Sequence, residues 1–259
     1  MVRASVEAAT RGLTLAGLVI PLASCGIARA WAPTDEQVLQ RILPSAVQVV
    51  LEQREGRRFR TASGVIIATR PTPTGTACFV LTAGHTFSGA ARGKEVYVIL
   101  GFHQGRAAKV QAALLAERET DDLDLALLRA ESDRCTPAIV GRTPILGEWA
   151  WVVAFPWGSR LTVARGVVSQ LDESDSRLMV DASVSYGASG AGVYEARTGS
   201  LIGVVEGYGT ARVSSQGGGA GWYFDVPVPG QTLVVSLRDI GRFLEDTGHT
   251  DLLQASFRR

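Results

Sequence analysis

Twelve short runs of β-forming residues, separated by turn residues, constrain the fold of this 259-residue chain more than any other feature. Each run is rich in Val, Ile, Leu or aromatic residues, and Gly, Pro, Asp or Ser separates one run from the next. The predicted strands are 46–52, 62–68, 78–82, 95–100, 109–117, 125–129, 149–155, 161–170, 177–181, 192–195, 201–205 and 222–226. A dozen strands with no helices between them predict a β-sandwich or a β-barrel architecture.

Two helices are expected, one before the strands and one after them. Thr34 and Gln37 have the spacing of a capping box, so a short helix is expected to begin there. A second helix is expected over about 236–247, with Ser236 as its N-cap and Gly248 just beyond its end. The predicted fold class is therefore all-β, with a short N-terminal helix and a C-terminal helix.

The composition excludes several classes of protein. Apolar residues make up 46% and charged residues 20% of the chain, which is unlike a disordered chain, a collagen-like fibre or a coiled coil. The net charge is +1 at pH 7, whereas a nucleic-acid-binding surface needs an excess of Lys and Arg. No nucleic-acid partner is expected.

The first residues have the pattern of an export signal. Arg3 and Arg11 are followed by the uncharged stretch 12–28, which is shorter than the ~20 apolar residues of a membrane-spanning helix. Residues 1–24 are therefore predicted to be a signal peptide, and the mature protein is expected outside the cytoplasm of a bacterial cell.

Two processing sites compete at the end of this signal. The residues Leu22-Ala-Ser-Cys25 resemble the bacterial lipobox, which predicts cleavage before Cys25, a lipid anchor on its thiol and a tether over 25–35. The alternative is an ordinary secretory cut after Ala30, with Ala28 as the second small residue. The first alternative predicts a lipoprotein on the periplasmic side of the envelope, and the second a secreted or soluble periplasmic protein.

Cys78 and Cys135 are the other two of the three cysteines. In an oxidising compartment they are expected to form a disulfide, and two buried free thiols are the alternative. The chain has no C-x-x-C or H-E-x-x-H spacing, so no metal site and no cofactor are predicted.

Three short strings carry the candidate chemistry. The string 81–85, Leu-Thr-Ala-Gly-His, places His85 directly after an apolar strand. The string 124–128, Asp-Leu-Ala-Leu-Leu, places Asp124 at the start of another strand, and 187–192, Gly-Ala-Ser-Gly-Ala-Gly, places Ser189 in a glycine-flanked turn. A serine hydroxyl becomes a nucleophile when a neutral imidazole accepts its proton, and a carboxylate must orient that imidazole.

These strings, in the order His, Asp, Ser, resemble the trypsin-like serine proteases, and specifically their HtrA-type branch. Further segments that resemble this branch are 42–49, 63–67, 166–169, 179–182, 201–204 and 224–227. The resemblance covers about 36–246 and implies a protease domain over 36–259. It also implies two antiparallel six-stranded β-barrels, about 40–140 and 141–232, with the site between them and no PDZ domain.

The resemblance implies a role for each site residue. His85 is the general base and later the general acid, Asp124 orients it, and Ser189 is the nucleophile. The backbone N–H groups of Gly187 and Ser189 form the oxyanion hole. Asp121 and Asp122 are alternatives to Asp124, but the Asp-Leu-Ala-Leu-Leu context favours Asp124.

The resemblance also implies a specificity pocket, with Ser183 at its base and Val205 and Glu206 in its wall. Two positions depart from the family pattern. Ala188 replaces the acidic residue that precedes the serine in zymogen-activated trypsins, so no activation cleavage is expected. Ala191 replaces a glycine, which puts the geometry of the oxyanion hole in question.

The predicted function is that of a serine endopeptidase acting on proteins or peptides, and the sequence indicates no oligomeric state. An α/β-hydrolase esterase is disfavoured, because Ala191 interrupts its Gly-x-Ser-x-Gly motif and the only histidine after the serine is His249, near the end of the chain. The remaining alternative is a protease-fold module that binds peptides or partner proteins at the cell envelope without efficient catalysis.

Overall fold

The computed structural model describes residues 32–120, 122–172, 177–214 and 222–254. The predicted signal peptide, the lipidation of Cys25, the cut after Ala30 and the alternative acid Asp121 lie outside the described residues. In the described part of the chain, no helix is long and apolar enough to span a membrane.

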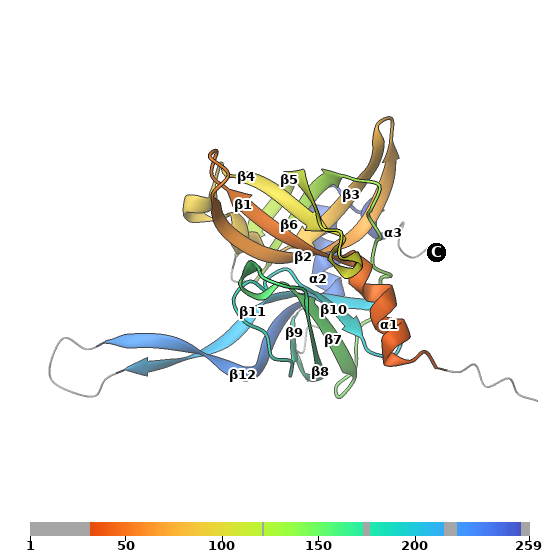
Figure 1. Cartoon of the computed structure of the whole chain (residues 1–259). Helices are drawn as coiled ribbons and strands as arrows, with labels where there is room; N and C mark the ends of the chain where they lie inside the picture. Colours follow the sequence, from red (N-terminus) through yellow and green to blue (C-terminus); the bar gives the residue numbers. More distant parts are fainter. Residues whose placement is uncertain (1–31, 121, 173–176, 215–221, 255–259) are drawn as a thin grey trace, which may run out of the picture. The chain divides into compact units, whose positions relative to one another are not determined.

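The described residues form two closed antiparallel β-barrels of six strands each (Figure 1). The first barrel has the neighbour order β1-β2-β3-β6-β5-β4, and the second has the order β10-β11-β12-β9-β8-β7. The first six strands are β1 (Ala46–Glu52), β2 (Arg58–Thr72), β3 (Gly75–Thr82), β4 (Glu95–Leu100), β5 (Ala108–Glu119) and β6 (Asp124–Glu131). The second six are β7 (Trp149–Ala154), β8 (Thr162–Leu171), β9 (Arg177–Val180), β10 (Gly192–Glu195), β11 (Leu201–Ser214) and β12 (Tyr223–Ser236). The predicted all-β double-barrel fold is confirmed.

Short helices complete the fold. The α-helices are α1 (Asp35–Ile42), α2 (Leu237–Asp246) and α3 (Asp251–Gln254), and the 3-10 turns are η1 (Leu43–Ser45), η2 (Gly84–Phe87), η3 (Gly89–Ala91), η4 (Phe102–Gln104) and η5 (Pro156–Gly158). The capping box of Thr34 and Gln37 is present at the start of α1. Ser236 caps α2, as predicted, by accepting from the Asp239 N–H at 3.4 Å.

The sequence underestimates the length of β11 and β12. The predicted strands 201–205 and 222–226 cover only the first part of each element, whereas the structure extends β11 to Ser214 and β12 to Ser236. Figure 1 shows their outer part as an arm that extends from the second barrel. Residues 210–214 of β11 are all exposed, so they carry no alternation of buried and exposed side chains that a pattern search could detect.

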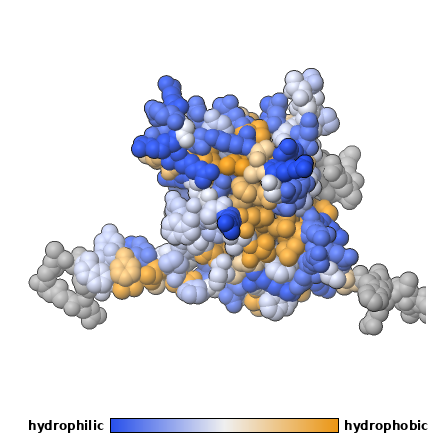
Figure 2. Space-filling view, viewed as in Figure 1, coloured by the Kyte–Doolittle hydropathy of each residue, from blue (hydrophilic) through white to orange (hydrophobic). Residues whose placement is uncertain are grey.

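Three apolar clusters hold these elements. One fills each barrel. The third contains residues of both barrels together with Val38 of α1 and Phe243 of α2. Leu125 of β6 and Phe155, which follows β7, are fully buried in this third cluster, so the two helices pack against the junction on which the site is built. On the face shown in Figure 2, polar residues cover much of the first barrel and apolar residues gather over the second barrel beside α1.

Cys78 and Cys135 form a disulfide, as predicted, with their Cα atoms 6.0 Å apart. Cys78 lies in β3, which leads to His85, and Cys135 follows β6, which begins at Asp124. The bridge therefore ties together the two segments that carry the candidate base and its candidate partner.

Candidate active site

Strand pairing in the first barrel brings His85 and Asp124 together. β3 and β6 are antiparallel neighbours, with Thr82 opposite Ala126, so the end of β3 lies beside the start of β6. His85 lies in the turn η2 just after β3, and Asp124 is the first residue of β6. Gly84 permits this approach, because a Cβ there would lie 2.3 Å from the carbonyl oxygen of Arg118.

The Asp124 carboxylate contacts His85 with both of its oxygens, one at the ring and one at the backbone N–H. Asp124 Oδ2 lies 2.6 Å from His85 Nδ1, and Asp124 Oδ1 accepts from the His85 backbone N–H at 2.7 Å. Because a carboxylate only accepts, Nδ1 carries the proton and Nε2 is the acceptor nitrogen of the neutral ring. The Asp124 hydrogen bond raises the pKa of His85 above its ordinary value, and burial opposes this shift.

Arg60 fixes the turn that carries His85. Its guanidinium donates to the carbonyl oxygen of His85 at 2.6 Å and to that of Thr86 at 3.1 Å. Its positive charge also lowers the pKa of His85. Arg60 therefore acts on His85 in two ways: its hydrogen bonds fix the backbone of the turn, and its charge lowers the pKa of the ring.

Ser189 lies in a turn that requires glycine on both sides. Gly187 and Gly190 have φ angles of +91° and +86°, a region that side chains disfavour. A Cβ at Gly187 would lie 2.8 Å from the Trp157 nitrogen, and one at Gly190 would lie 2.2 Å from the Ser63 carbonyl oxygen. The two glycines allow the turn to approach β2 and η5 closely.

The N–H groups of Gly187 and Ser189 are available as donors, since neither donates to an acceptor in the described parts of the chain. The Tyr186 carbonyl oxygen accepts from the Trp157 N–H at 2.7 Å. Because the C=O and N–H of a trans peptide point in opposite directions, this bond directs the Gly187 N–H away from Trp157. Two unpaired donors in one turn suit a developing oxyanion.

One hollow is lined by both His85 and the Ser189 turn. It has a volume of about 260 Å³ and contains His85, Gly187 and Ser189 in its wall. The remaining lining residues are Arg60, Thr61, Ala62, Thr86, Ser88 and Tyr186. Within the described ranges, no group of His, Cys, Asp and Glu side chains could hold a metal ion.

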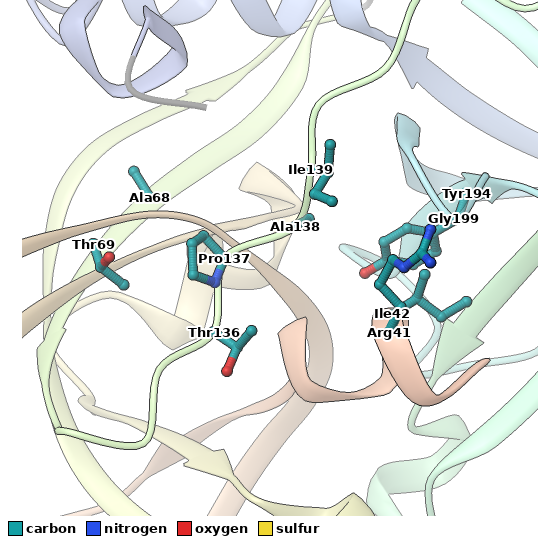
Figure 3. A pocket seen from close by; sticks show the side chains of 10 residues that line it. All are labelled: Arg41, Ile42, Ala68, Thr69, Thr136, Pro137, Ala138, Ile139, Tyr194 and Gly199. Atoms are coloured by element: carbon teal, nitrogen blue, oxygen red, sulfur yellow. The ribbon is translucent and has the colours of Figure 1, made fainter. Parts of the chain in front are cut away.

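A second cavity, of about 270 Å³, contains none of the candidate residues (Figure 3). Arg41 and Ile42 of α1, Pro137 and Tyr194 are among its lining residues. The Arg41 guanidinium donates to the Thr198 carbonyl oxygen at 2.9 Å. This cavity is therefore separate from the hollow that contains His85 and Ser189.

Residues 62–204 match the trypsin-like peptidase domain family. The chain belongs to this family. It is similar to the probable periplasmic serine endoprotease DegP-like of Hahella chejuensis, with 29% identity over 178 residues, which is 66% of this chain and 34% of that protein. The chain thus spans about a third of the length of this curated relative.

Two solved structures share the fold of this trypsin-like peptidase domain. The serine endoprotease from Yersinia pestis has a TM-score of 0.61 and 21% identity, over 86% of this chain and 67% of that chain. Deg5 has a TM-score of 0.58 and 18% identity, over 80% of this chain and 90% of that chain. The family match confirms the predicted trypsin-like peptidase domain, and the similarity to a DegP-like protein agrees with the predicted HtrA-type branch.

The departure from the family pattern at Ala191 lies away from the two free N–H groups. The Ala191 methyl group is fully buried in the apolar cluster of the second barrel. The Ala191 N–H donates to the Ala188 carbonyl oxygen at 2.9 Å, which directs the Ser189 N–H in the opposite direction. In this peptidase domain the extra methyl group therefore fills the core and does not occupy the hollow.

The three residues predicted to form a specificity pocket lie in different environments. Ser183 is exposed, and Val205 is fully buried in the core of the second barrel. Glu206 is partly buried and forms an ion pair with Arg177, with 3.1 Å between Glu206 Oε1 and Arg177 Nη2. The specificity pocket stays a prediction.

Sequence reasoning missed the residues that support the site from a distance. Ser63, Arg60 and Arg177 contact the site residues through hydrogen bonds or lie beside them, although 25 to 124 positions separate the bonded pairs along the chain. Trp157 was missed as well, and it is the one non-glycine residue with a positive φ, +56°, in the described segments. No local sequence pattern marks such long-range contacts.

Proposed function

We propose that this chain is a serine endopeptidase that cleaves peptide bonds through an acyl-enzyme intermediate. The observation that carries the proposal is that His85, which is hydrogen-bonded to Asp124, lines one hollow together with Ser189. The Ser189 Oγ attacks the carbonyl carbon of the peptide bond, and His85 Nε2 accepts the hydroxyl proton. The N–H groups of Gly187 and Ser189 donate to the oxyanion of the tetrahedral intermediate.

The second half of the cycle uses the same groups. His85 gives its proton to the leaving amine as the carbon–nitrogen bond breaks, which leaves the substrate acyl group on Ser189 Oγ. Water then attacks this ester while His85 accepts a proton from the water and returns it to the Ser189 oxygen. Asp124 stays ionised, fixes the His85 tautomer and stabilises the imidazolium. No cofactor enters these steps, and the substrates are proteins or peptides.

Replacement of the nucleophile tests the proposal. Ser189→Ala should lower peptidase turnover about 10⁶-fold and abolish labelling by a fluorophosphonate probe. Ser169→Ala, which removes an exposed hydroxyl on β8, is the matched control and should keep both activities. Wild-type protein that binds peptides but reacts with neither substrate nor probe would instead support the peptide-binding module.

The same proposal includes export and a lipid anchor. Residues 1–24 are the signal peptide, 25–35 the tether and 36–259 the protease domain, with a diacylglycerol on Cys25. The lipobox pattern, the Cys78–Cys135 disulfide and the similarity to a DegP-like protein described as periplasmic support this reading. Structural disulfides form in oxidising compartments such as the periplasm.

Cell fractionation tests the anchor. Wild-type protein should stay with membranes through a salt wash, because two or more acyl chains hold a protein stably. Cys25→Ala should release the protein into the soluble fraction. A soluble wild-type protein that begins at Trp31 would contradict the anchor and favour the cut after Ala30, while the protease proposal would stand.

A further inference from the structure

A second carboxylate lies beside the His85–Asp124 pair. Glu206 of β11 lines a hollow of about 500 Å³ that also contains His85, Glu119, Thr120, Asp124 and Arg177. Arg177, the first residue of β9, donates to Glu206 Oε1 at 3.1 Å. An ion pair between β9 and β11 of the second barrel thus lies beside His85 and Asp124 of the first barrel.

A β-bulge aims Glu206 at this place. In the pairing of β11 with β12, Val205 lies opposite Val234 and Gly207 lies opposite Leu233, so Glu206 is the extra residue. A bulge of this kind redirects the side chain of its extra residue. The bulge follows directly on Val205, whose carbonyl oxygen accepts from the Gly190 N–H at 2.7 Å, so the Ser189 turn and Glu206 are held by the same strand.

Arg177 partly neutralises a carboxylate that is costly to bury. The Glu206 side chain is 19% exposed, and its Oε2 is buried with no hydrogen-bond partner in the described residues. Burial raises the pKa of Glu206, the Arg177 charge lowers it, and the Asp124 charge raises it. Both Asp124 oxygens accept hydrogen bonds from His85, as expected of an ionised carboxylate. Asp124 and Glu206 therefore repel each other as like charges.

We propose that Glu206 and Arg177 are positioning residues that balance the charge around the His85–Asp124 pair. Glu206 supplies a further negative charge, and Arg177 partly neutralises it. The proposal rests on the serine protease function proposed above.

The charges that face His85 come from five strands, and they nearly cancel. They are Arg60 on β2, Glu119 on β5, Asp124 on β6, Arg177 on β9 and Glu206 on β11. Glu119 lies opposite Asp124 in the pairing of β5 with β6. Three carboxylates and two guanidiniums leave one net negative charge, which favours the imidazolium form of His85. Loss of either member of the Arg177–Glu206 pair changes this balance by one unit, in opposite directions.

The two single variants should therefore shift the titration of His85 in opposite directions. Arg177→Gln leaves an uncancelled carboxylate, so the imidazolium is favoured and the titration moves to higher pH. Glu206→Gln removes a negative charge near His85, so the titration moves to lower pH by about 0.5–1 pH unit. The double variant should return close to the wild-type value, because the two charges are then removed together.

Two readouts measure the shift. The His85 imidazole can be followed by NMR against pH, because the chain has only three histidines and His85→Ala assigns its signals. The rate of labelling by a fluorophosphonate probe against pH gives the same titration through reactivity. Wild-type protein that titrates at His85 but is not labelled would reject the protease function, and the NMR shifts would still test the charge balance.

The controls separate charge from folding. Arg212→Gln and Asp225→Asn break an ion pair of the same kind on the outer arm, with 2.9 Å between Arg212 Nε and Asp225 Oδ1, and should leave the titration unchanged. Arg177→Lys keeps the charge and should stay close to wild type. If Arg177→Gln does not fold, the downward shift of Glu206→Gln relative to Asp225→Asn carries the test. Single variants that shift in the same direction, or by no more than the controls, would overturn the proposal.

Discussion

The Ser63 hydroxyl donates a 2.8 Å hydrogen bond to the Gly187 carbonyl oxygen, across 124 positions of sequence. The Ser63 backbone N–H donates to the Ser189 carbonyl oxygen at 2.9 Å, and the Phe155 N–H donates to Ser63 Oγ at 2.9 Å. Thr82 Oγ1 in turn donates to the Ser63 carbonyl oxygen at 2.7 Å. One fully buried residue of the first barrel therefore holds both residues of the proposed oxyanion hole and the end of β7.

Ser63→Ala should lower kcat about 10- to 100-fold with little change in KM, because a small misplacement of the oxyanion donors affects the transition state more than the bound substrate. The variant also leaves the buried Phe155 N–H without its acceptor, so its unfolding temperature should fall. Steady-state kinetics well below that temperature separate the two effects. Ser169→Ala is the control, since the exposed Ser169 hydroxyl donates to the Met179 carbonyl oxygen, which belongs to β9. Equal kcat values for the two variants would remove Ser63 from the positioning of the hole.

The raised pKa of His85 predicts opposite pH dependences for activity and for stability. Catalysis needs the neutral ring, so kcat/KM should fall as the pH falls through a pKa above the ordinary 6.5. The folded state binds the proton more tightly than the unfolded chain, so this contribution to stability is present below the unfolded pKa and is lost as the pH rises through the folded pKa. Activity and unfolding measured over the same pH range should show the two trends.

Asp124→Asn tests the cause of this pKa. The amide cannot stabilise the imidazolium as a carboxylate does, so the pKa of His85 should fall, and kcat should fall about 10⁴-fold, the cost of the same change in a Ser-His-Asp triad. Asp122→Asn is the control, because Asp122 is an alternative candidate for this role in the sequence but is exposed, whereas the carboxylate that bonds His85 belongs to Asp124. An unchanged His85 titration in Asp124→Asn would contradict the hydrogen bond as the cause.

The disulfide should contribute to stability and not to chemistry. Cys78 is fully buried in the core of the first barrel, and its bridge to Cys135 spans 57 positions. Opening a loop of this length should cost about 4 kcal/mol by the chain-entropy account. Cys78→Ser with Cys135→Ser should therefore unfold at lower denaturant concentration, while probe labelling of the folded variant continues at the wild-type rate. Reducing agent should lower the stability of wild type and leave that of the double variant unchanged.

The sequence predicts local features of this chain well and long-range contacts poorly. The strand bounds 46–52, 95–100 and 192–195 agree with β1, β4 and β10, because apolar β-forming residues fill them and turn residues bound them. Asp124 and Ser189 could be proposed from the sequence because each lies in a string whose neighbouring residues also match a known pattern. Ser63 lies in a recognised segment, yet its hydroxyl bonds residues 92 and 124 positions away, which only the folded chain reveals.

Charged partners were harder still to predict. Glu206 was expected in the wall of a specificity pocket, but a one-residue bulge in β11 determines where its side chain goes. Arg177 lies in no recognisable sequence motif, and its pairing with Glu206 depends on β9 and β11 both lying beside β12.

The helix α3 could not be predicted either, because its four residues are too few to produce a helical period.

Trp157 should reverse the usual order of alanine and glycine. Its φ and ψ of +56° and +20° lie in the left-handed region, where a Cβ costs roughly 1 kcal/mol and glycine is free of that cost. The side chain is 72% exposed and contacts Tyr186, with 5.3 Å between ring centroids, so its removal empties no core. Trp157→Gly should therefore be more stable than Trp157→Ala by about 1 kcal/mol in denaturant unfolding.

Both variants keep the N–H that donates to the Tyr186 carbonyl oxygen, so both should react with the fluorophosphonate probe at close to the wild-type rate. Trp157→Pro lacks that N–H and cannot adopt a positive φ, and it should lose both stability and labelling. If the alanine variant were the more stable, the left-handed backbone at residue 157 would not be a feature of the folded protein.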